Sequence, residues 1–392
     1  MDKKVSLWYL VKVFLFIGFT AFGGYTALVA IIRERLVEQD KVLDDRLIMD
    51  SITLASILPG PLAVNITAYI GFYLKGWRGA LLSMASVLFP SVLLMILLAE
   101  FQNRFNEIGF VATFFKGVMP VIAAIIFSVA FKMSQKNIKT WWQRLVFVLA
   151  LICAFVFKGY FVFLLSIVIS GLAGLFFGET KEPAITSVDL SGKIPSALIG
   201  VGVFGLLFLP IALMLSEEAV LFNTFSKVSL TLFGGGYVMI PVLHDLVVEQ
   251  NLWLSSSEFA QSIAFGQITP GPILVSATYV GYKVSGIMGA LVATVGIFLP
   301  SALLIILVGV FYQSISGLSI ITKLFLGISP AITGFIVFSV SLIVPLDEID
   351  WFSGFAIFIS VVAIARFKVN FFWLMLVFGS LSVMLDLILI NS

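Results

Sequence analysis

Long apolar runs separated by short polar segments dominate the chain. A membrane-spanning helix needs about 20 apolar residues. Such runs lie near residues 7–30, 51–74, 78–100, 109–132, 144–157, 160–178, 197–216, 221–248, 258–283, 288–313, 318–346, 351–366 and 369–390. The pattern predicts an all-α polytopic membrane protein with about 13 membrane segments. The most polar stretch, residues 179–193, predicts a linker between two halves.

Composition and charge narrow the class of protein. Of 392 residues, 60% are hydrophobic and 11% are charged, whereas about a quarter are charged in an ordinary soluble domain. A soluble globular fold and a disordered chain are therefore excluded. The formal charge of +2 predicts no nucleic-acid partner. One cysteine, Cys153, and one histidine, His244, exclude a disulfide framework and a multi-histidine metal site, so we expect no cofactor and no metal.

The charges between the apolar runs predict an orientation. Basic residues gather on one side of the successive crossings, which places the N-terminus in the cytoplasm and the C-terminus outside a cell inner (plasma) membrane. Residues 33–46 fall on the outer side despite four basic residues, and they carry five acidic residues as well. We interpret this stretch as an interfacial amphipathic segment.

The second half of the chain repeats the first. Phe22-Gly23-Gly24 recurs as Phe233-Gly234-Gly235, and Pro59-Gly60-Pro61 recurs as Pro270-Gly271-Pro272. The repeat predicts three parts: residues 1–178, a linker with an unpaired helix at 179–220, and residues 221–392. The unpaired run makes the number of crossings before the second repeat odd, so the repeats are predicted to be inverted, a signature of secondary transporters. If the Pro-Gly-Pro segments re-enter the membrane instead of crossing it, the repeats become parallel unless a further segment is also broken.

The two Pro-Gly-Pro motifs predict broken helices inside apolar segments. Proline removes a backbone donor and glycine loosens the backbone, and broken backbone at membrane depth must be buried in protein or line a wet cavity. A restarting helix offers N–H groups that favour an anion. A simple kink is the alternative, but matched breaks in two repeats favour a substrate site. The candidate residues are Ser56, Pro59, Gly60, Pro61, Asn65, Gln267, Thr269, Pro270, Gly271, Pro272, Ile273 and Ser276.

Two further matched features join this candidate site. The glycine runs permit close backbone approach or a second break, although small-residue helix packing explains them equally well; their members are Gly23, Gly24, Gly234, Gly235 and Gly236. Lys116 and Lys323 lie near matched prolines inside apolar runs. Cations without carboxylate partners in a membrane indicate a site for an anion, and snorkelling is the alternative.

The ordered motifs resemble the chromate transporter family. In the second half these are Phe233 to Tyr237, Trp253-Leu254, Glu258-Phe259, Gln267 to Pro272 and Phe298 to Ser301, and the first half repeats the glycine and Pro-Gly-Pro motifs. The resemblance covers nearly the whole chain outside the linker. It implies the fused two-domain form with antiparallel halves, and efflux of chromate, a sulfate-like tetrahedral dianion, driven by the proton-motive force.

The sequence departs from this family in its first half. Tyr25-Thr26-Ala27 stands where many members have a proline and a histidine, and Ser56-Ile57-Leu58 stands where the second half has Gln267-Ile268-Thr269. We therefore expect the second repeat to contact the ligand more directly. A tetrahedral dianion only accepts hydrogen bonds, so we expect Gln267, Thr269 and free N–H groups near Gly271 and Ile273 to donate them. At least one of Lys116 and Lys323 is expected to face the permeation path.

Other classes of protein fit less well. No G-x-x-x-x-G-K-[ST] motif is present, which argues against an ATP-driven pump. A single loop histidine without buried carboxylates cannot form the usual centre of a membrane enzyme. An anion channel, or a transporter of another small anion such as sulfate, remains open. The expected partners are a small inorganic oxyanion and the lipid bilayer, and a homodimer is left open.

Overall fold

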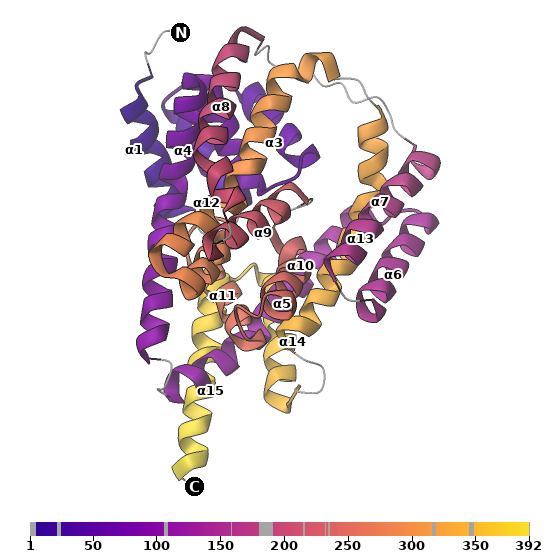
Figure 1. Cartoon of the computed structure of the whole chain (residues 1–392). Helices are drawn as coiled ribbons and strands as arrows, with labels where there is room; N and C mark the ends of the chain where they lie inside the picture. Colours follow the sequence, from indigo (N-terminus) through magenta and orange to yellow (C-terminus); the bar gives the residue numbers. More distant parts are fainter. Residues whose placement is uncertain are drawn as a thin grey trace. The chain divides into compact units, whose positions relative to one another are not determined.

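The computed structural model of the chain consists of α-helices joined by short turns (Figure 1). It describes residues 5–21, 25–105, 109–157, 159–179, 191–214, 216–231, 233, 236–315, 319–344 and 349–391. These residues form no β-strand, which confirms the predicted all-α class. The α-helices are α1 (Leu7–Thr20), α2 (Tyr25–Arg33), α3 (Asp45–Ile57), α4 (Leu62–Phe105), α5 (Gly109–Asn137), α6 (Trp141–Val156), α7 (Tyr160–Phe177), α8 (Ile194–Leu213), α9 (Glu217–Thr231), α10 (Ile240–His244), α11 (Ser256–Ile268), α12 (Ser276–Ile315), α13 (Ser319–Ile343), α14 (Trp351–Phe367) and α15 (Phe371–Asn391).

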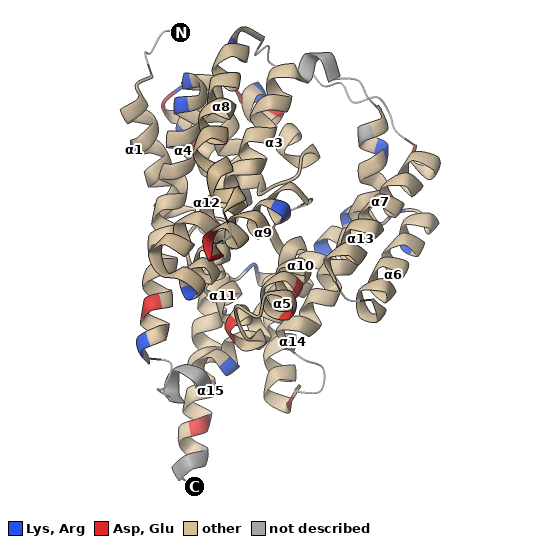
Figure 2. Cartoon of the chain, viewed as in Figure 1, with Lys and Arg blue, Asp and Glu red and all other residues tan. Residues whose placement is uncertain are grey.

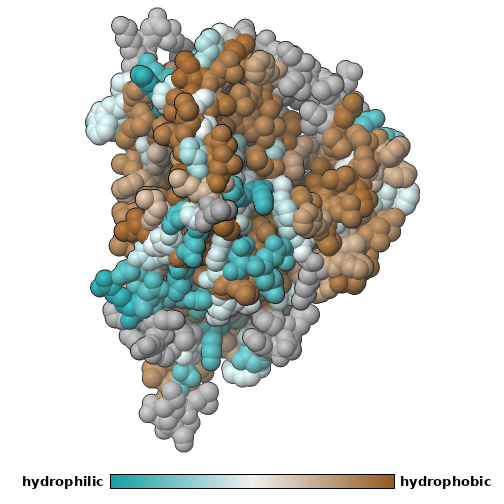
Figure 3. Space-filling view, in the orientation of Figure 1, coloured by the Kyte–Doolittle hydropathy of each residue, from teal (hydrophilic) through white to brown (hydrophobic). Residues whose placement is uncertain are grey.

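The apolar helices identify a multi-pass membrane protein. Among the described residues, seven helices are long and apolar enough to cross a bilayer, and three shorter apolar helices accompany them. Charged residues are sparse along these helices, and apolar side chains cover much of the visible surface (Figures 2 and 3). Phe161, Phe176 and Leu206 are among the large side chains left exposed, as expected where lipid replaces water around the protein. The total of thirteen crossings stays a prediction.

The chain folds into two compact units, and each takes segments from both sequence repeats. Unit 1 comprises residues 1–96, 179–236 and 269–322, and unit 2 comprises residues 97–178, 237–268 and 323–392. The units therefore divide the chain differently from the predicted repeats 1–178 and 221–392. The segment 237–268 belongs to unit 2, although the chain on both sides of it belongs to unit 1.

Helix α12 forms the core of unit 1. It packs along α9, and α8 contacts both of these helices (Figure 1). The backbone N–H of Ser301 in α12 donates a hydrogen bond to the Ser229 hydroxyl in α9, at 3.3 Å. On the first-repeat side, Gly18 of α1 lies so close to the backbone of Val87 in α4 that a Cβ atom would come within 2.6 Å of the Val87 carbonyl oxygen. Small residues thus permit the two helix pairs to pack closely.

Helix α5 forms the core of unit 2. It packs against α14 and α15, and α11 contacts both α5 and α15 (Figure 1). Helices α6 and α7 pack on each other. Gly174 and Gly327 bring α7 and α13 together, since a side chain at either position would collide with the backbone of the facing helix. This close approach follows the small-residue rule for helix packing in membranes.

Irregular backbone recurs at matched positions of the two repeats. Two π-helical segments, η1 (Glu34–Gln39) and η4 (Asp245–Gln250), occupy equivalent places. The long helices α4 and α12 bend at equivalent points, where Gly76 has φ +62° and Gly286 has φ +59°. Because these departures from regular helix coincide residue by residue, the repeat found in the sequence is confirmed as a repeat of structure.

The helix ends agree with most of the predicted run boundaries, and four of the predicted runs are divided: 51–74 and 258–283 at the Pro-Gly-Pro motifs, and 7–30 and 221–248 near the glycine runs. The bends at Gly76 and Gly286 separate the predicted runs 51–74 from 78–100 and 258–283 from 288–313. The predicted run 221–248 is divided, because α9 ends at Thr231 and a 3-10 segment, η3 (Gly236–Met239), precedes α10 and η4. The predicted run 7–30 is divided likewise between α1 and α2. The glycine-rich sequences next to these interruptions disfavour continuous helix.

Candidate functional site

The first Pro-Gly-Pro motif lies between two helices of unit 1. Helix α3 ends at Ile57 and α4 begins at Leu62. Gly60 connects them with φ +123°, a conformation that side-chain-bearing residues rarely adopt. The Asn65 side-chain amide donates to the carbonyl oxygen of Pro59 at 3.2 Å, which ties α4 back to the break. Asn65 is fully buried, and among the described residues its Oδ1 atom has no hydrogen-bond partner.

The second Pro-Gly-Pro motif has the same construction. Helix α11 ends at Ile268, Gly271 has φ +109°, and a 3-10 turn, η5 (Ile273–Val275), leads into α12. The backbone N–H of Gly271 donates to the carbonyl oxygen of Ala21 at 3.0 Å. The expectation of a free N–H at Gly271 is therefore wrong. A buried amide in an apolar surrounding needs a partner, and the end of α1 provides it.

The two motifs make reciprocal contacts with the opposite repeat inside unit 1. Gly60 lies against Ser301 of α12, so closely that a Cβ atom would overlap the serine side chain. Gly271 lies against Ser91 of α4, where a Cβ atom would be 3.1 Å from the hydroxyl oxygen. Ser91 and Ser301 are equivalent residues of the two repeats, and both are fully buried. Such an exchange of equivalent contacts is the mark of a two-fold relation.

Gly236 extends this arrangement at the second break. It begins η3, and a Cβ atom there would overlap the side chain of Ile273, the first residue of η5. Gly236 therefore serves close packing beside the Pro-Gly-Pro motif. Gly23, Gly24, Gly234 and Gly235 lie outside the described residues.

The polar candidates around the second break differ in their surroundings. Thr269 and Ser276 are buried in unit 1. Gln267 belongs to unit 2, where its Oε1 atom accepts a hydrogen bond from the Tyr237 hydroxyl at 3.1 Å. Its Nε2 atom is buried and has no partner among the described residues. A held amide with an unused N–H₂ group is suited to donate to an acceptor-only ligand.

The first repeat lacks this donor. Ser56 occupies the position equivalent to Gln267, but its side chain is exposed and its hydroxyl donates to the Ile52 carbonyl oxygen at 2.7 Å. Pro59, Gly60 and Pro61 are buried next to it. The two breaks thus share a backbone conformation and differ in the polar groups beside it. More direct contact of the second repeat with the ligand stays a prediction.

The two lysines lie on different helices of unit 2. Lys116 is an exposed residue of α5, and Lys323 is a partly buried residue of α13. Their role in the permeation path stays a prediction.

Sequence reasoning missed two groups of residues. No role in the site was predicted for Ser91 and Ser301, whereas the structure places them against the two motif glycines. Their position after Pro90 and Pro300, in the middle of long helices, was the available signal. Tyr237, which orients Gln267, carried no signal beyond its place after the glycine run.

Comparison with known proteins gives one family. Residues 8–175 and residues 219–383 both match the family model described as Chromate transporter. An uncharacterized transporter of Methanocaldococcus jannaschii is 32% identical over 75% of this chain and 73% of its own length. A protein named chromate transport protein in Cupriavidus metallidurans is 26% identical over 92% of this chain and 88% of its own length. A protein of that name in Pseudomonas aeruginosa is 26% identical over 74% of this chain and 69% of its own length. No solved structure matches the chain.

Proposed function

This chain belongs to the chromate transporter family, and from that premise we propose that it is a secondary active carrier of a tetrahedral oxyanion. We propose chromate as the substrate, efflux as the direction and the proton-motive force as the driving force. The carrier sits in the cell inner membrane with a cytoplasmic N-terminus. The relatives named chromate transport protein support this substrate class.

The reciprocal contact of the two Pro-Gly-Pro motifs is the observation that carries the proposal. Each broken helix packs against a serine of the opposite repeat, Gly60 on Ser301 and Gly271 on Ser91. Two equivalent packings of one repeated unit are what a carrier needs in order to expose a single site to either side in turn. We propose that the two-fold axis lies in the membrane plane and that the motifs border a common polar site.

The chemistry of the second break suits a dianion. Chromate and sulfate accept hydrogen bonds and donate none, so their site must present donors. The buried Nε2 group of Gln267 is such a donor, and the Tyr237 hydroxyl fixes the orientation of its amide. Thr269 and Ser276 add hydroxyl groups near the start of α12. Lys116 or Lys323 supplies full positive charge in this scheme, because helix termini contribute about half a charge each.

Counterflow in proteoliposomes tests the proposal. Vesicles holding the purified protein and unlabelled chromate or sulfate are diluted into the labelled oxyanion, and its entry is followed. A carrier gives transient, saturable accumulation that depends on internal oxyanion. Continuous ionic current without exchange would instead identify a channel, and absence of exchange for every oxyanion in the panel would refute the proposed function.

A matched pair of variants localises the site. A hydrogen bond to a charged group is worth about 1.5–3 kcal/mol, so Gln267→Ala should weaken oxyanion binding roughly 10- to 100-fold. Ser56→Ala removes the equivalent side chain of the first repeat and should have the smaller effect, because the Ser56 hydroxyl already donates to Ile52. Equal effects of the two changes, or no effect of Gln267→Ala in folded protein, would remove Gln267 from the site.

A further inference from the structure

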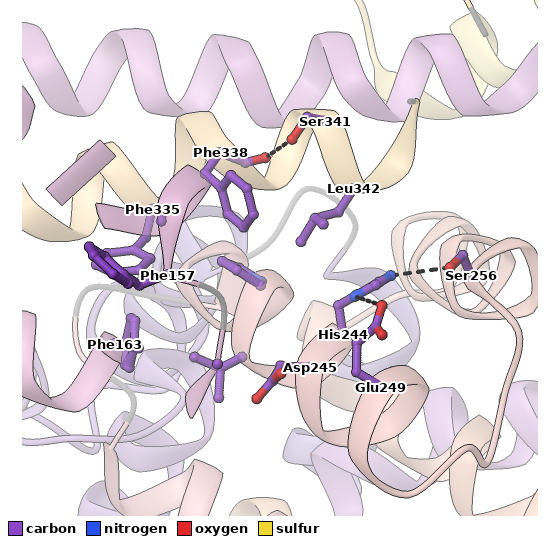
Figure 4. A pocket seen from close by; sticks show the side chains of 14 residues that line it. Phe157, Phe163, His244, Asp245, Glu249, Ser256, Phe335, Phe338, Ser341 and Leu342 are labelled. Atoms are coloured by element: carbon purple, nitrogen blue, oxygen red, sulfur yellow. Dashed lines mark hydrogen bonds and ion pairs between the residues drawn. The ribbon is translucent and has the colours of Figure 1, made fainter. Parts of the chain in front are cut away.

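His244 is buried beside a cavity that the oxyanion site does not use. The sequence suggested a loop histidine, but the structure places His244 at the end of α10, where it is 6% exposed. The adjoining cavity has a volume of about 180 Å³ and lies entirely within unit 2. Figure 4 shows the imidazole between Ser256 on one side and Glu249 on the other. Nε2 is 3.4 Å from the Ser256 hydroxyl, and Nδ1 is 3.9 Å from the Glu249 carboxylate.

The equivalent position in the first repeat carries a permanent charge. Arg33 stands where the second repeat has His244, and Asp45 stands where it has Ser256. The Arg33 guanidinium donates to both carboxylate oxygens of Asp45, at 2.7 and 2.8 Å. At the contact between the start of a π-helical segment and the following helix, one repeat therefore has an ion pair and the other has a histidine–serine pair. Imidazole is the side chain whose charge ordinarily changes between about pH 5 and 8.

The groups around the imidazole allow a proton to reach it. The Glu249 side chain is 59% exposed while that of His244 is 8% exposed, so the carboxylate links the buried ring to solvent. Asp245, the second titratable group in the cavity wall, accepts from the backbone N–H of Tyr160 and from the Gln250 amide, both at 2.8 Å. Among the described residues, α6, α7 and α13 contribute apolar side chains and Ser341 to the wall, and no titratable group. Of the carboxylates in the cavity wall, Glu249 is the one within ion-pair distance of the His244 ring.

Helix α11 connects this histidine to the candidate oxyanion donor. Ser256 is the first residue of α11 and Gln267 is the last but one, about 16 Å further along the helix. Tyr237, at the start of the same chain segment, holds Gln267 by its hydroxyl. When a proton binds, both ring nitrogens become donors, and Ser256 and Glu249 both serve as acceptors. The two groups thus lie at opposite ends of one helix.

We propose that His244 binds the proton that the carrier exchanges for oxyanion. The inference rests on the proposed transport function and assigns its coupling group. A proton from solvent adds to the unprotonated ring nitrogen of the neutral imidazole, and the resulting imidazolium pairs with Glu249. Release of the same proton on the other side of the membrane regenerates the neutral ring. Segment 237–268 suits this role, because it belongs to unit 2 and continues at both ends into unit 1.

The test compares exchange with proton-driven accumulation in the same proteoliposomes. Counterflow of labelled sulfate or chromate needs no net proton movement, whereas accumulation under an imposed pH gradient does. His244→Gln, which cannot carry a proton, should lower the ratio of proton-driven accumulation to counterflow at least tenfold. His244→Arg, which imitates Arg33, should lower this ratio similarly and remove the pH dependence of counterflow. Arg33→Gln is the matched control and should keep the wild-type ratio.

Each outcome separates the inference from the function on which it rests. No counterflow in the wild-type protein refutes the proposed function. Wild-type counterflow without proton-driven accumulation refutes proton coupling while leaving oxyanion exchange intact. A wild-type ratio in His244→Gln refutes the assignment of His244. Loss of both activities in a His244→Gln protein that remains monodisperse and keeps its unfolding temperature also refutes it, because the histidine would then serve exchange itself.

Discussion

Replacing the two motif glycines by alanine should cost unequal amounts of stability. Both residues have positive φ, and holding a non-glycine residue in such a region costs of order 1–3 kcal/mol. At Gly60 the new methyl group also overlaps the Ser301 side chain, and overpacking adds about 1–3 kcal/mol. At Gly271 the methyl group would lie 3.1 Å from the Ser91 hydroxyl, which a small rotation relieves. Gly60→Ala should therefore lose about 2–6 kcal/mol and Gly271→Ala about 1–3 kcal/mol.

Equilibrium unfolding of the detergent-solubilised protein by dodecyl sulfate, followed by circular dichroism, measures both losses. Gly202→Ala in α8 is the control, since a Cβ atom there meets open space and alanine favours helix by up to about 1 kcal/mol. Adding Ser301→Gly to Gly60→Ala should recover the part of the overlap component that Ser301 causes, at most about 1–3 kcal/mol, and leave both the φ component and the overlap with the Asn65 side-chain amide. Equal losses at Gly60 and Gly271, or strict additivity in the double variant, would refute the reciprocal packing.

Three further predictions concern charge and hydrogen bonding. The Arg33 guanidinium beside Asp45 holds the pKa of that carboxyl below its ordinary value. The pair therefore stabilises the fold at neutral pH and ceases to do so as the pH falls through that pKa. The unfolding temperatures of the wild-type protein and Arg33→Gln should differ slightly at pH 7 and converge in acid. Lys116→Gln and Lys323→Gln should each lower oxyanion counterflow, and unaltered rates in both would show that the lysines only snorkel. Tyr237→Phe removes the hydroxyl that orients Gln267 and should weaken oxyanion binding less than Gln267→Ala, as measured by calorimetric titration with sulfate.

Local chemistry made much of the architecture predictable. Proline and glycine act within one or two residues of their own position, so the gaps at Pro59–Pro61 and Pro270–Pro272 and the bends at Gly76 and Gly286 follow from sequence. The repeat was equally visible, because a constant offset needs no knowledge of packing. The apolar runs gave the helices for the same reason, since a bilayer imposes its length on each of them.

The packing contacts between distant segments could not be predicted from the pattern of apolar runs. Residues 26–57 and 237–268 are equivalent in sequence, yet the first belongs to unit 1 and the second to unit 2. Which surface a segment packs on depends on side chains far away in the chain. The hydropathy of the segment itself does not identify those side chains. The contacts of Gly60 with Ser301 and of Gly271 with Ser91 were hidden for this reason. Burial of His244 was hidden as well, because the cavity beside it is lined by residues of α6, α7 and α13, and its ring packs on Phe259 of α11.

The comparison of the repeats distinguishes the residues that pack the helix breaks of this transporter from those proposed to bind its ligands. The packing residues are the same in both repeats: a glycine at each break and a serine facing it. The two states of the proposed carrier require this sameness, since an inequality of about 1.4 kcal/mol between two packings already shifts their populations about tenfold. Ligand chemistry carries no such requirement, because the proposed exchange of one oxyanion for one proton needs one set of binding groups. Gln267 replaces Ser56, and His244 with Ser256 replaces Arg33 with Asp45. Substitutions of the packing residues should therefore impair the protein in either repeat, whereas loss of polar groups should impair it chiefly in the second.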